Sequence, residues 1–183
     1  FDPVIVAYAV QKGGESVAYQ RRKRARTSNI QAITDAHGSV VASTGIVAGN
    51  HHDAFDLKPQ LQAAFKHLRR LGLTFTGAYF NADSAFDRDA RKVGLNHQVI
   101  PNLAENQRGR KRLFNPTIYK QRFTSERSFA WIDNFRASLM RDDRKDANFL
   151  GAHHLAFALI NLRTYVREKF ESVYRYANHN RNL

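Results

Sequence analysis

Asp83 stands at a place in the chain where a carboxylate could do chemistry. It closes the stretch Asn81–Ala82–Asp83, which follows the apolar run Leu73–Phe80. We expect this run to be a strand buried on both faces, and open α/β sheets hold ligand groups on the loops that follow such strands. The alternative is that Asn81, Asp83 and Ser84 only cap the next helix. Position alone does not decide between the two.

A second candidate group consists of Tyr119, Arg122 and Glu126, which are three and four residues apart. On a helix this spacing places all three side chains on one face. There a carboxylate could hold a metal ion while the cation and the phenol bind a phosphate oxygen. The alternative is an ordinary surface pair between Arg122 and Glu126, worth only about 0.3–0.5 kcal/mol. Taken by itself, the spacing favours the surface pair.

The histidines suggest a zinc site less convincingly. His51, His52 and Asp53 are consecutive, and His153 and His154 are adjacent. Imidazole and carboxylate are good zinc ligands, but no pair here has the i, i+4 spacing of a helical zinc site. Neighbouring residues on a helix or strand also point apart. A solvated turn explains Asp53 more simply, so we expect no zinc site.

The net charge indicates the partner. The chain has 29 Lys and Arg against 16 Asp and Glu, a formal charge of +13, which attracts polyanions. Nucleic acid is the expected partner, and a merely soluble basic protein or a membrane-surface binder is the alternative. Many cations lie in two segments that no apolar core would accept without partners. They are Arg21, Arg22, Lys23, Arg24 and Arg26 in the first segment, and Arg108, Arg110, Lys111 and Arg112 in the second.

Composition excludes several classes of protein. The 183 residues are 43% hydrophobic, enough for the core of one domain spanning residues 1–183. There is no cysteine, which excludes disulfides and thiolate zinc sites. No run approaches the roughly 20 apolar residues of a membrane helix, and no signal peptide is visible. We expect a soluble cytoplasmic protein, and a fragment, because the chain opens on Phe1 and its only methionine is Met140.

The first part of the chain predicts strands and one helix. Val4–Val10 is apolar and partly β-branched, as in a strand. Two further strand-like runs, Asn29–Thr34 and Ser39–Val47, are joined by turn-forming residues and predict an antiparallel hairpin. Pro59 suits the first turn of a helix with apolar residues at helical spacing, and Gly72 is its natural stop.

The second part of the sequence predicts a strand, a helix and a strand, followed by two long helices. After the strand Leu73–Phe80 we expect a helix over about 85–93 and a strand His97–Ile100 stopped by Pro101. Two long helices follow, Pro116–Met140 and one that begins near Asp146. The apolar stripe of the second helix is Phe149, Ala152, Ala156, Leu159, Val166, Phe170 and Val173. This order predicts an α/β fold, a mixed sheet of antiparallel and parallel strands with helices packed on it.

Separated blocks of residues, in chain order, resemble one family. The blocks are Tyr19 to Thr27 with Thr34, Asp35 and Gly38; Gly49–Asp53; Phe80–Phe86; and Tyr119, Arg122 and Glu126 with Ser128–Trp131 and Phe135–Arg136. Together they are similar to bacterial insertion-sequence transposases with a DDE transposase domain, over most of the chain. The resemblance implies a ribonuclease H-like fold and a triad of Asp, Asp and Glu.

The resemblance assigns the triad residue by residue. The second aspartate maps onto Asp83 and the glutamate onto Glu126. Asp2 is the only carboxylate within reach of the first position, although Pro3–Val4 follows it where the family has a small residue and a threonine. The alternatives are that the first aspartate was lost or lies upstream of Phe1.

This chain also departs from the family signature at the signature's closing lysine. That position is Asp133 here, so the phosphate contact of the lysine would fall to Arg127 or Arg136. Tyr119, Arg122 and the two basic segments would bind the DNA backbone without reading its sequence.

The expected reaction is cleavage and strand transfer of DNA by two Mg²⁺ or Mn²⁺ ions about 4 Å apart, held by Asp83, Glu126 and Asp2. The partners would be double-stranded DNA at transposon ends and targets and, when active, a second copy in a homodimer. We expect no membrane partner, and a location in the bacterial cytoplasm with the nucleoid. Two rivals stay open: a degenerate transposase that only binds DNA, and a hydrolytic nuclease without strand transfer.

Overall fold

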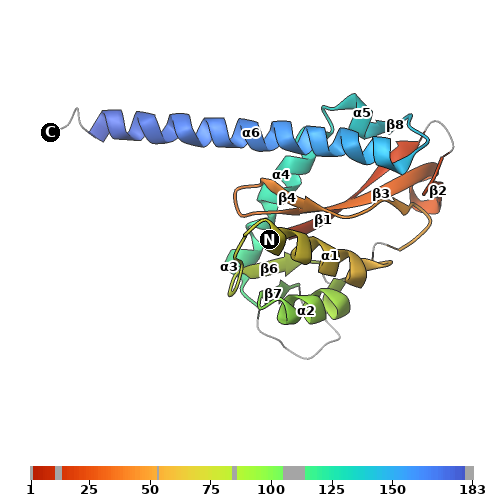
Figure 1. Ribbon diagram of the computed structural model, residues 1–183, viewed down its shortest axis with the longest axis horizontal. Coiled ribbons are helices and arrows are strands. Elements are labelled where there is room, and N and C mark those ends of the chain that lie inside the picture. The colour runs from red at the N-terminus through yellow and green to blue at the C-terminus, as the bar shows by residue number, and fades with distance from the viewer. Residues whose placement is uncertain (1, 11–13, 53, 84–85, 105–113, 180–183) are drawn as a thin grey trace.

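The computed structural model describes residues 2–10, 14–52, 54–83, 86–104 and 114–179. Within these ranges the fold is a mixed α/β arrangement of a six-stranded sheet, a two-stranded sheet and helices packed around them (Figure 1). The predicted fold class is therefore confirmed at the level of mixed strands and helices. None of the described helices is both long and apolar enough to cross a membrane.

The larger sheet is built around β3 (Ala25–Thr34), eight of whose ten residues are buried. β1 (Asp2–Val10) runs antiparallel beside it, with Asp2 opposite Thr34. The other strands that pair antiparallel with β3 are β2 (Ala18–Gln20), β4 (Val40–Ser43) and β5 (Val47–Ala48), while β8 (Met140–Arg141) is parallel to β1.

The predicted early hairpin is confirmed, although β3 begins four residues earlier than expected. Its turn is held by Asp35, whose Oδ1 accepts the N–H groups of His37 and Ser39 at 2.9 and 2.8 Å. Gly38 has φ +89°, a conformation that favours glycine. The turn chemistry of these residues is what made the hairpin predictable.

The smaller sheet pairs β6 (Tyr79–Ala82) with β7 (Ile100–Leu103) in parallel, joined through α2 (Asp87–Asn96). The prediction of a strand from Leu73 is wrong for its first six residues, because Leu73–Ala78 form irregular backbone and turns that include Gly77 at φ +77°. Phe75 in this segment is buried, so its apolar character reflects core packing and not a strand.

The prediction that Pro101 ends a strand is also wrong. β7 begins at Ile100 and continues through Pro101 to Leu103. Among the described strands β7 pairs only with β6, so the missing N–H of proline can face away from the ladder.

Two apolar clusters fill the core. One joins α1 (Leu57–Arg70), α2, β6 and β7 around Phe65 and Phe80, both 0% exposed. The other joins β3 and β4 to later helices around Ile132 and Phe149. Each fully buried side chain of this size stabilises the fold by about 1.5–3 kcal/mol.

The expected single helix over 116–140 is broken into three. It divides into α3 (Pro116–Tyr119), α4 (Arg122–Ile132) and α5 (Arg136–Leu139), followed by β8. Turns at 120–121 and 133–134 interrupt the helix, and Phe135 is extended at the start of α5. Ser128 of α4 donates to the carbonyl of Gly38 in the β3–β4 turn. α4 therefore follows the sheet and does not continue the direction of α3.

The last helix, α6 (Asp146–His179), begins where it was predicted to begin, and its C-terminal end projects beyond the sheets (Figure 1). It covers the outer edge of β4. The amide of Asn161 accepts from the N–H of Val40 and donates to its carbonyl, both at 2.8 Å, as a neighbouring strand would. An otherwise unpaired strand edge is protected in this way.

The predicted apolar stripe of α6 is only partly buried. Phe149 and Ala156 face the core, whereas Leu159, Val166 and Phe170 are 45%, 41% and 63% exposed. The helix turns a different face to the sheet, which also includes His153, Phe157, Ile160 and Thr164.

Candidate functional site

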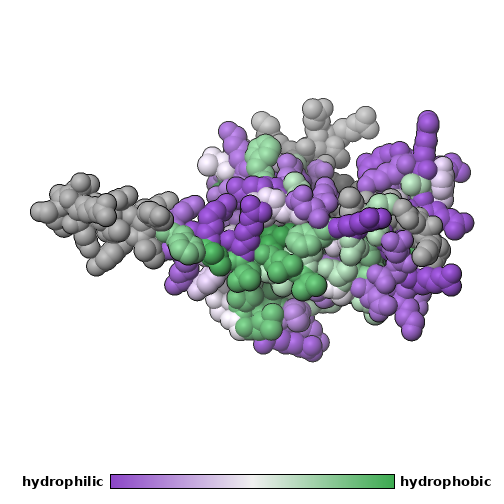
Figure 2. All heavy atoms as spheres, turned by 90° about the horizontal axis from the view of Figure 1, so that it is seen from above, coloured by the Kyte–Doolittle hydropathy of each residue, from purple (hydrophilic) through white to green (hydrophobic). Residues whose placement is uncertain are grey.

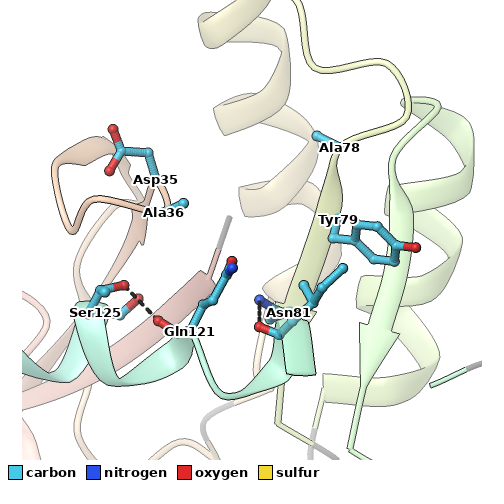
Figure 3. Close-up of a pocket in the computed structure, with 9 residues that line it drawn as sticks. Asp35, Ala36, Ala78, Tyr79, Asn81, Gln121 and Ser125 are labelled. Atoms are coloured by element: carbon cyan, nitrogen blue, oxygen red, sulfur yellow. Dashed lines mark hydrogen bonds between the residues drawn. The ribbon is translucent and has the colours of Figure 1, made fainter. Parts of the chain in front are cut away.

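A pocket of about 280 Å³ lies where three parts of the chain meet. Its walls come from the β3–β4 turn, from β6 with the residue before it, and from α3, the α3–α4 turn and α4 (Figure 3). The lining residues are Asp35, Ala36, Ala78, Tyr79, Asn81, Ile118, Gln121, Thr124 and Ser125. The pocket is thus formed by the same segments that carry the predicted site residues.

Asp83 and Glu126 do not line this pocket. Asp83 comes two residues after the lining residue Asn81, and Glu126 comes one residue after Ser125. Both residues are exposed to solvent.

Asn81 does not cap the following helix, which was the alternative interpretation of this residue. Its side chain is 5% exposed and turned toward Asn102, whose Nδ2 donates to Asn81 Oδ1 at 2.7 Å. The first residue before α2 is Phe86, and its N–H donates to the carbonyl of Asp83. Ser84 lies outside the described residues.

Three asparagines connect the two short strands to α3. Asn102, 1% exposed, donates to Asn81 and to the carbonyl of Asn115 at 3.1 Å, and its Oδ1 accepts the N–H of Asn115 at 2.7 Å. Asn115 then caps α3 by accepting the N–H groups of Thr117 and Ile118. This asparagine chain fixes where α3 begins relative to the ends of β6 and β7.

Tyr119 and Arg122 contact each other directly, although the break after α3 places them on different helices. Arg122 donates from Nη1 to the Tyr119 hydroxyl, and its guanidinium lies 5.1 Å from the Tyr119 ring centroid. These contacts hold the guanidinium of Arg122 in place beside the Tyr119 ring.

A hydrogen bond next to Glu126 attaches α4 to the sheet. The hydroxyls of Ser125 and Thr34 lie 2.5 Å apart, and both residues are buried. Thr34 is the residue opposite Asp2 in the β1–β3 ladder. The backbone of Asp2 therefore lies in the same region as the start of α4, while its side chain is outside the described part of the structure.

A complete metal site is not present among the described side chains. Within that part of the chain, no group of three or more His, Asp or Glu could hold an ion. Asp83 and Glu126 provide two exposed carboxylates, so a further ligand would have to come from elsewhere, such as Asp2.

The first basic segment lies far from the pocket. Arg21, Arg22 and Lys23 form the 3-10 helix η1 just before β3, and Arg24 and Arg26 are exposed beside it. The pocket is at the other end of β3, ten residues away, which is about 30 Å along a strand. The second segment, Arg108, Arg110, Lys111 and Arg112, lies outside the described residues.

The remaining candidate cations lie on α4 or just after it. Arg127 is exposed, with its guanidinium 5.6 Å from the Trp131 ring centroid, and Arg163 of α6 contacts the same ring at 5.2 Å. Arg136 and Asp133 are both exposed.

The histidines do not converge on one site. His153 is buried against Phe149, and desolvation lowers its pKa to about 4, although a hydrogen bond to the Phe149 carbonyl opposes this. His154 contacts Ser43, while His51 stacks on Phe55. Asp53 lies outside the described residues.

Sequence reasoning missed the asparagine chain and Ser125. Asn115 followed by Pro116 is a recognisable helix start, since asparagine is a favoured cap and proline a favoured first residue. No local signal marks Asn102 or Ser125, because their partners are distant in sequence.

Comparison with known proteins gives one match. A family model described as "Transposase DDE domain" matches residues 6–162. No curated protein and no solved structure matches the chain. The matched range includes Asp83, Tyr119, Arg122 and Glu126 and begins after Asp2.

Proposed function

Because this chain belongs to the transposase DDE domain family, we propose that it is a DNA transposase that cleaves phosphodiester bonds at insertion-sequence ends and joins them to target DNA. Membership of the family supports a transposition-related nuclease or transferase function. The observation that carries the proposal for this chain is the shared pocket, which joins the end of β3, β6 and the start of α4. Asp83 follows its lining residue Asn81 by two positions, and Glu126 follows Ser125 by one.

Asp83, Glu126 and Asp2 would hold the divalent metal ions. Hard oxygen ligands suit Mg²⁺ or Mn²⁺, and converging carboxylates repel one another unless a cation lies between them. Bound ions of this kind stabilise the charge on the attacking and leaving oxygens of an in-line displacement. The two exposed carboxylates of the structure fit this role, and Asp2 would complete the set.

The other residues would bind and orient the DNA strand. Arg122, held by Tyr119, would contact a phosphate oxygen next to the reacting bond, and Arg127 or Arg136 would take the place of the signature lysine. The two basic segments would contact the backbone farther away. The protein would act in the bacterial cytoplasm, where nucleoid DNA is its substrate.

The strand arrangement supports a ribonuclease H-like fold. Three antiparallel strands, β1, β3 and β4, precede a parallel pair, β6 and β7, linked through a helix. The proposed ligands follow the order of a DDE triad, on β1, after β6 and on α4.

The test is a nicking assay on DNA that carries the element's ends, with Mg²⁺ or Mn²⁺. Asp83→Asn and Glu126→Gln should each lower the rate by at least about 100-fold, because each removes a charge from the metal ligands without changing shape. DNA binding should survive. Glu171→Gln is the matched control, since Glu171 is an exposed acid on α6 and should not matter. Nicking retained in both site variants would remove these residues from the mechanism.

A second candidate is a degenerate transposase that binds DNA without cutting it. One observation favours it: the family match begins after Asp2. The variant Asp2→Asn distinguishes an active transposase from a degenerate one. Loss of nicking with binding retained supports the enzyme, whereas DNA binding by the unmodified chain without nicking under either cation supports the degenerate reading. A joining assay with a preprocessed 3′ end separates a transposase from a plain nuclease.

A further inference from the structure

α6 carries a second apolar face that the fold leaves uncovered. We call it the outer stripe: Leu155, Leu159, Leu162 and Val166, which are 64%, 45%, 57% and 41% exposed. At about 100° per residue these positions fall on the side of the helix opposite the buried residues His153 and Ile160. A helix that is apolar on two opposite sides is typical of one buried on both.

The space-filling view from above shows hydrophobic side chains gathered along the middle of the molecule, over α6 (Figure 2). The helix also continues past the sheets (Figure 1), and Glu168, which contacts His37 of the β3–β4 turn, marks where its projecting end begins. Phe170 on this projecting end is 63% exposed. Unsupported helices are marginal in water, which makes a partner along the projecting end energetically useful.

We propose that the outer stripe binds the outer stripe of a second copy of this chain, with the two α6 helices antiparallel. The spacings within the stripe are four, three and four residues, a sequence that reads the same in both directions. An antiparallel copy therefore places Leu155 opposite Val166 and Leu159 opposite Leu162, giving four apolar layers. Alternating steps of three and four are also the pattern of packed helix pairs.

The charges beside the stripe do not oppose this register. Arg163 lies on one edge of the stripe and Lys169 on the other. In an antiparallel pair the same flank of each helix meets, so these cations fall beside uncharged positions of the second copy, 156 and 159 for Arg163 and 151 and 155 for Lys169. The stripe with Phe170 exposes roughly 500 Å² per copy, so two copies would bury up to about 1,000 Å², the size of a weak and reversible interface. Because each copy carries a charge of +13, added salt should strengthen the pair.

The first experiment measures the mass of the full chain by sedimentation equilibrium, without DNA. We expect a reversible dimer at concentrations up to about 100 µM. Leu159→Glu and Leu162→Glu should each weaken it by at least about tenfold, because a charge would enter an apolar layer. Leu95→Glu is the matched control, since Leu95 is 64% exposed on α2 and should leave the dimer unchanged.

The second experiment tests the direction of the helices. The chain has no cysteine, so single-cysteine variants report one position each. A mixture of Leu155→Cys and Val166→Cys chains should form a disulfide-linked pair on mild oxidation. Each variant alone should not, because antiparallel helices keep identical positions 155 about 16 Å apart.

Several results would overturn the proposal. They are a chain that stays monomeric over the whole concentration range, a dimer that survives both glutamate substitutions, or self-linking of Leu155→Cys alone, which would mean parallel helices. Since no DNA or metal is present, failure here leaves the proposed cleavage chemistry untouched.

Discussion

At the scale of single residues, the position of α3 depends on the buried amide of Asn102. Its amide joins Asn81, at the end of β6, to Asn115, at the start of α3. A buried amide that loses its partners is costly, so the chain of three asparagines resists small shifts of α3. The helix that follows carries Glu126.

Asn102→Ala should therefore lower both stability and nicking. Removing its hydrogen bonds should cost about 1–3 kcal/mol of unfolding free energy, because the partner amides stay buried. Thr117→Ala, at an exposed position on the same short helix, is the control and should change stability by less than about 0.5 kcal/mol. Thermal unfolding and the nicking rate check both effects. Unchanged stability in Asn102→Ala would show that the asparagine chain does not hold α3.

His153 predicts a pH dependence. Its pKa is about 4 in the folded chain against an ordinary value of 6.5, because burial disfavours the charged ring. Below pH 6.5 the unfolded chain therefore binds a proton more readily than the folded chain, and stability falls until about pH 4. Above pH 6.5 this residue contributes no pH dependence.

The measurement is urea unfolding at pH 7 and at pH 4 for the unmodified chain and for His153→Gln. The unmodified chain should lose on the order of 2–3 kcal/mol more than the variant between these two values. His154→Gln serves as the control, since His154 is exposed. Equal losses in all three proteins would mean that His153 is not held in its neutral form.

At the scale of elements, Arg141 is the main link between β8, the sheet and α6. The side chain is fully buried, and it donates to Asp146 at 2.6 Å and to Ser28 at 2.7 Å. Its guanidinium also lies 5.0 Å from the ring centroid of Phe149. Asp146 is the first residue of α6, so this cluster sets where the long helix leaves the sheet.

Arg141→Met should destabilise the chain by about 1.5–3 kcal/mol, because it removes the charged hydrogen bonds of a buried guanidinium and leaves polar partners behind. Arg167→Gln is the matched control: its pair with Glu171 is exposed and 3.8 Å long, and should be worth less than about 1 kcal/mol. Chemical denaturation of both variants gives the comparison. Similar small losses would show that the Arg141 cluster is not an anchor of α6.

The elements that local patterns predicted are those whose cause is local. The Asp35–Gly38 turn, β1 and the start of α6 follow from turn residues, β-branched runs and a helix start. Local patterns did not show the breaks between α3, α4 and α5, and the hydrogen bond that joins α4 to the hairpin, from Ser128 to Gly38, connects residues 90 positions apart. The same holds for the pocket, whose walls are distant in sequence.

For the candidate site, sequence reasoning identified residues but not their setting. Tyr119 and Arg122 were expected on one helix face and do touch, although on separate helices. The role of Asp83 and Glu126 stays a prediction, because it needs ions and DNA. The partly exposed stripe of α6 could not be foreseen, since periodicity shows an apolar face but not which side the core takes.

At the scale of the whole molecule, the first basic segment and the pocket lie at opposite ends of β3, about 30 Å apart. That distance corresponds to roughly nine base pairs of duplex. A duplex bound at the pocket would have to extend this far to reach Arg21, Arg22, Lys23 and Arg24.

Replacing these four residues by glutamine should therefore weaken binding to a 20-base-pair duplex and flatten its salt dependence, with little effect on a 6-base-pair duplex. Fluorescence anisotropy at several salt concentrations measures both. The same number of changes at Lys58, Lys66, Arg69 and Arg70 of α1 is a charge-matched control. If that control weakens binding equally, net charge and not this segment attracts the DNA.

The central claim is that Asp83 and Glu126 hold ions in common. Crystals grown with Mn²⁺ test it most directly, because the anomalous signal locates the metal without reference to activity. The account predicts Mn²⁺ within about 2.2 Å of a carboxylate oxygen of each residue, either one shared ion or two ions about 4 Å apart. Mn²⁺ bound elsewhere, or two carboxylates too far apart to bridge such a pair, would contradict it.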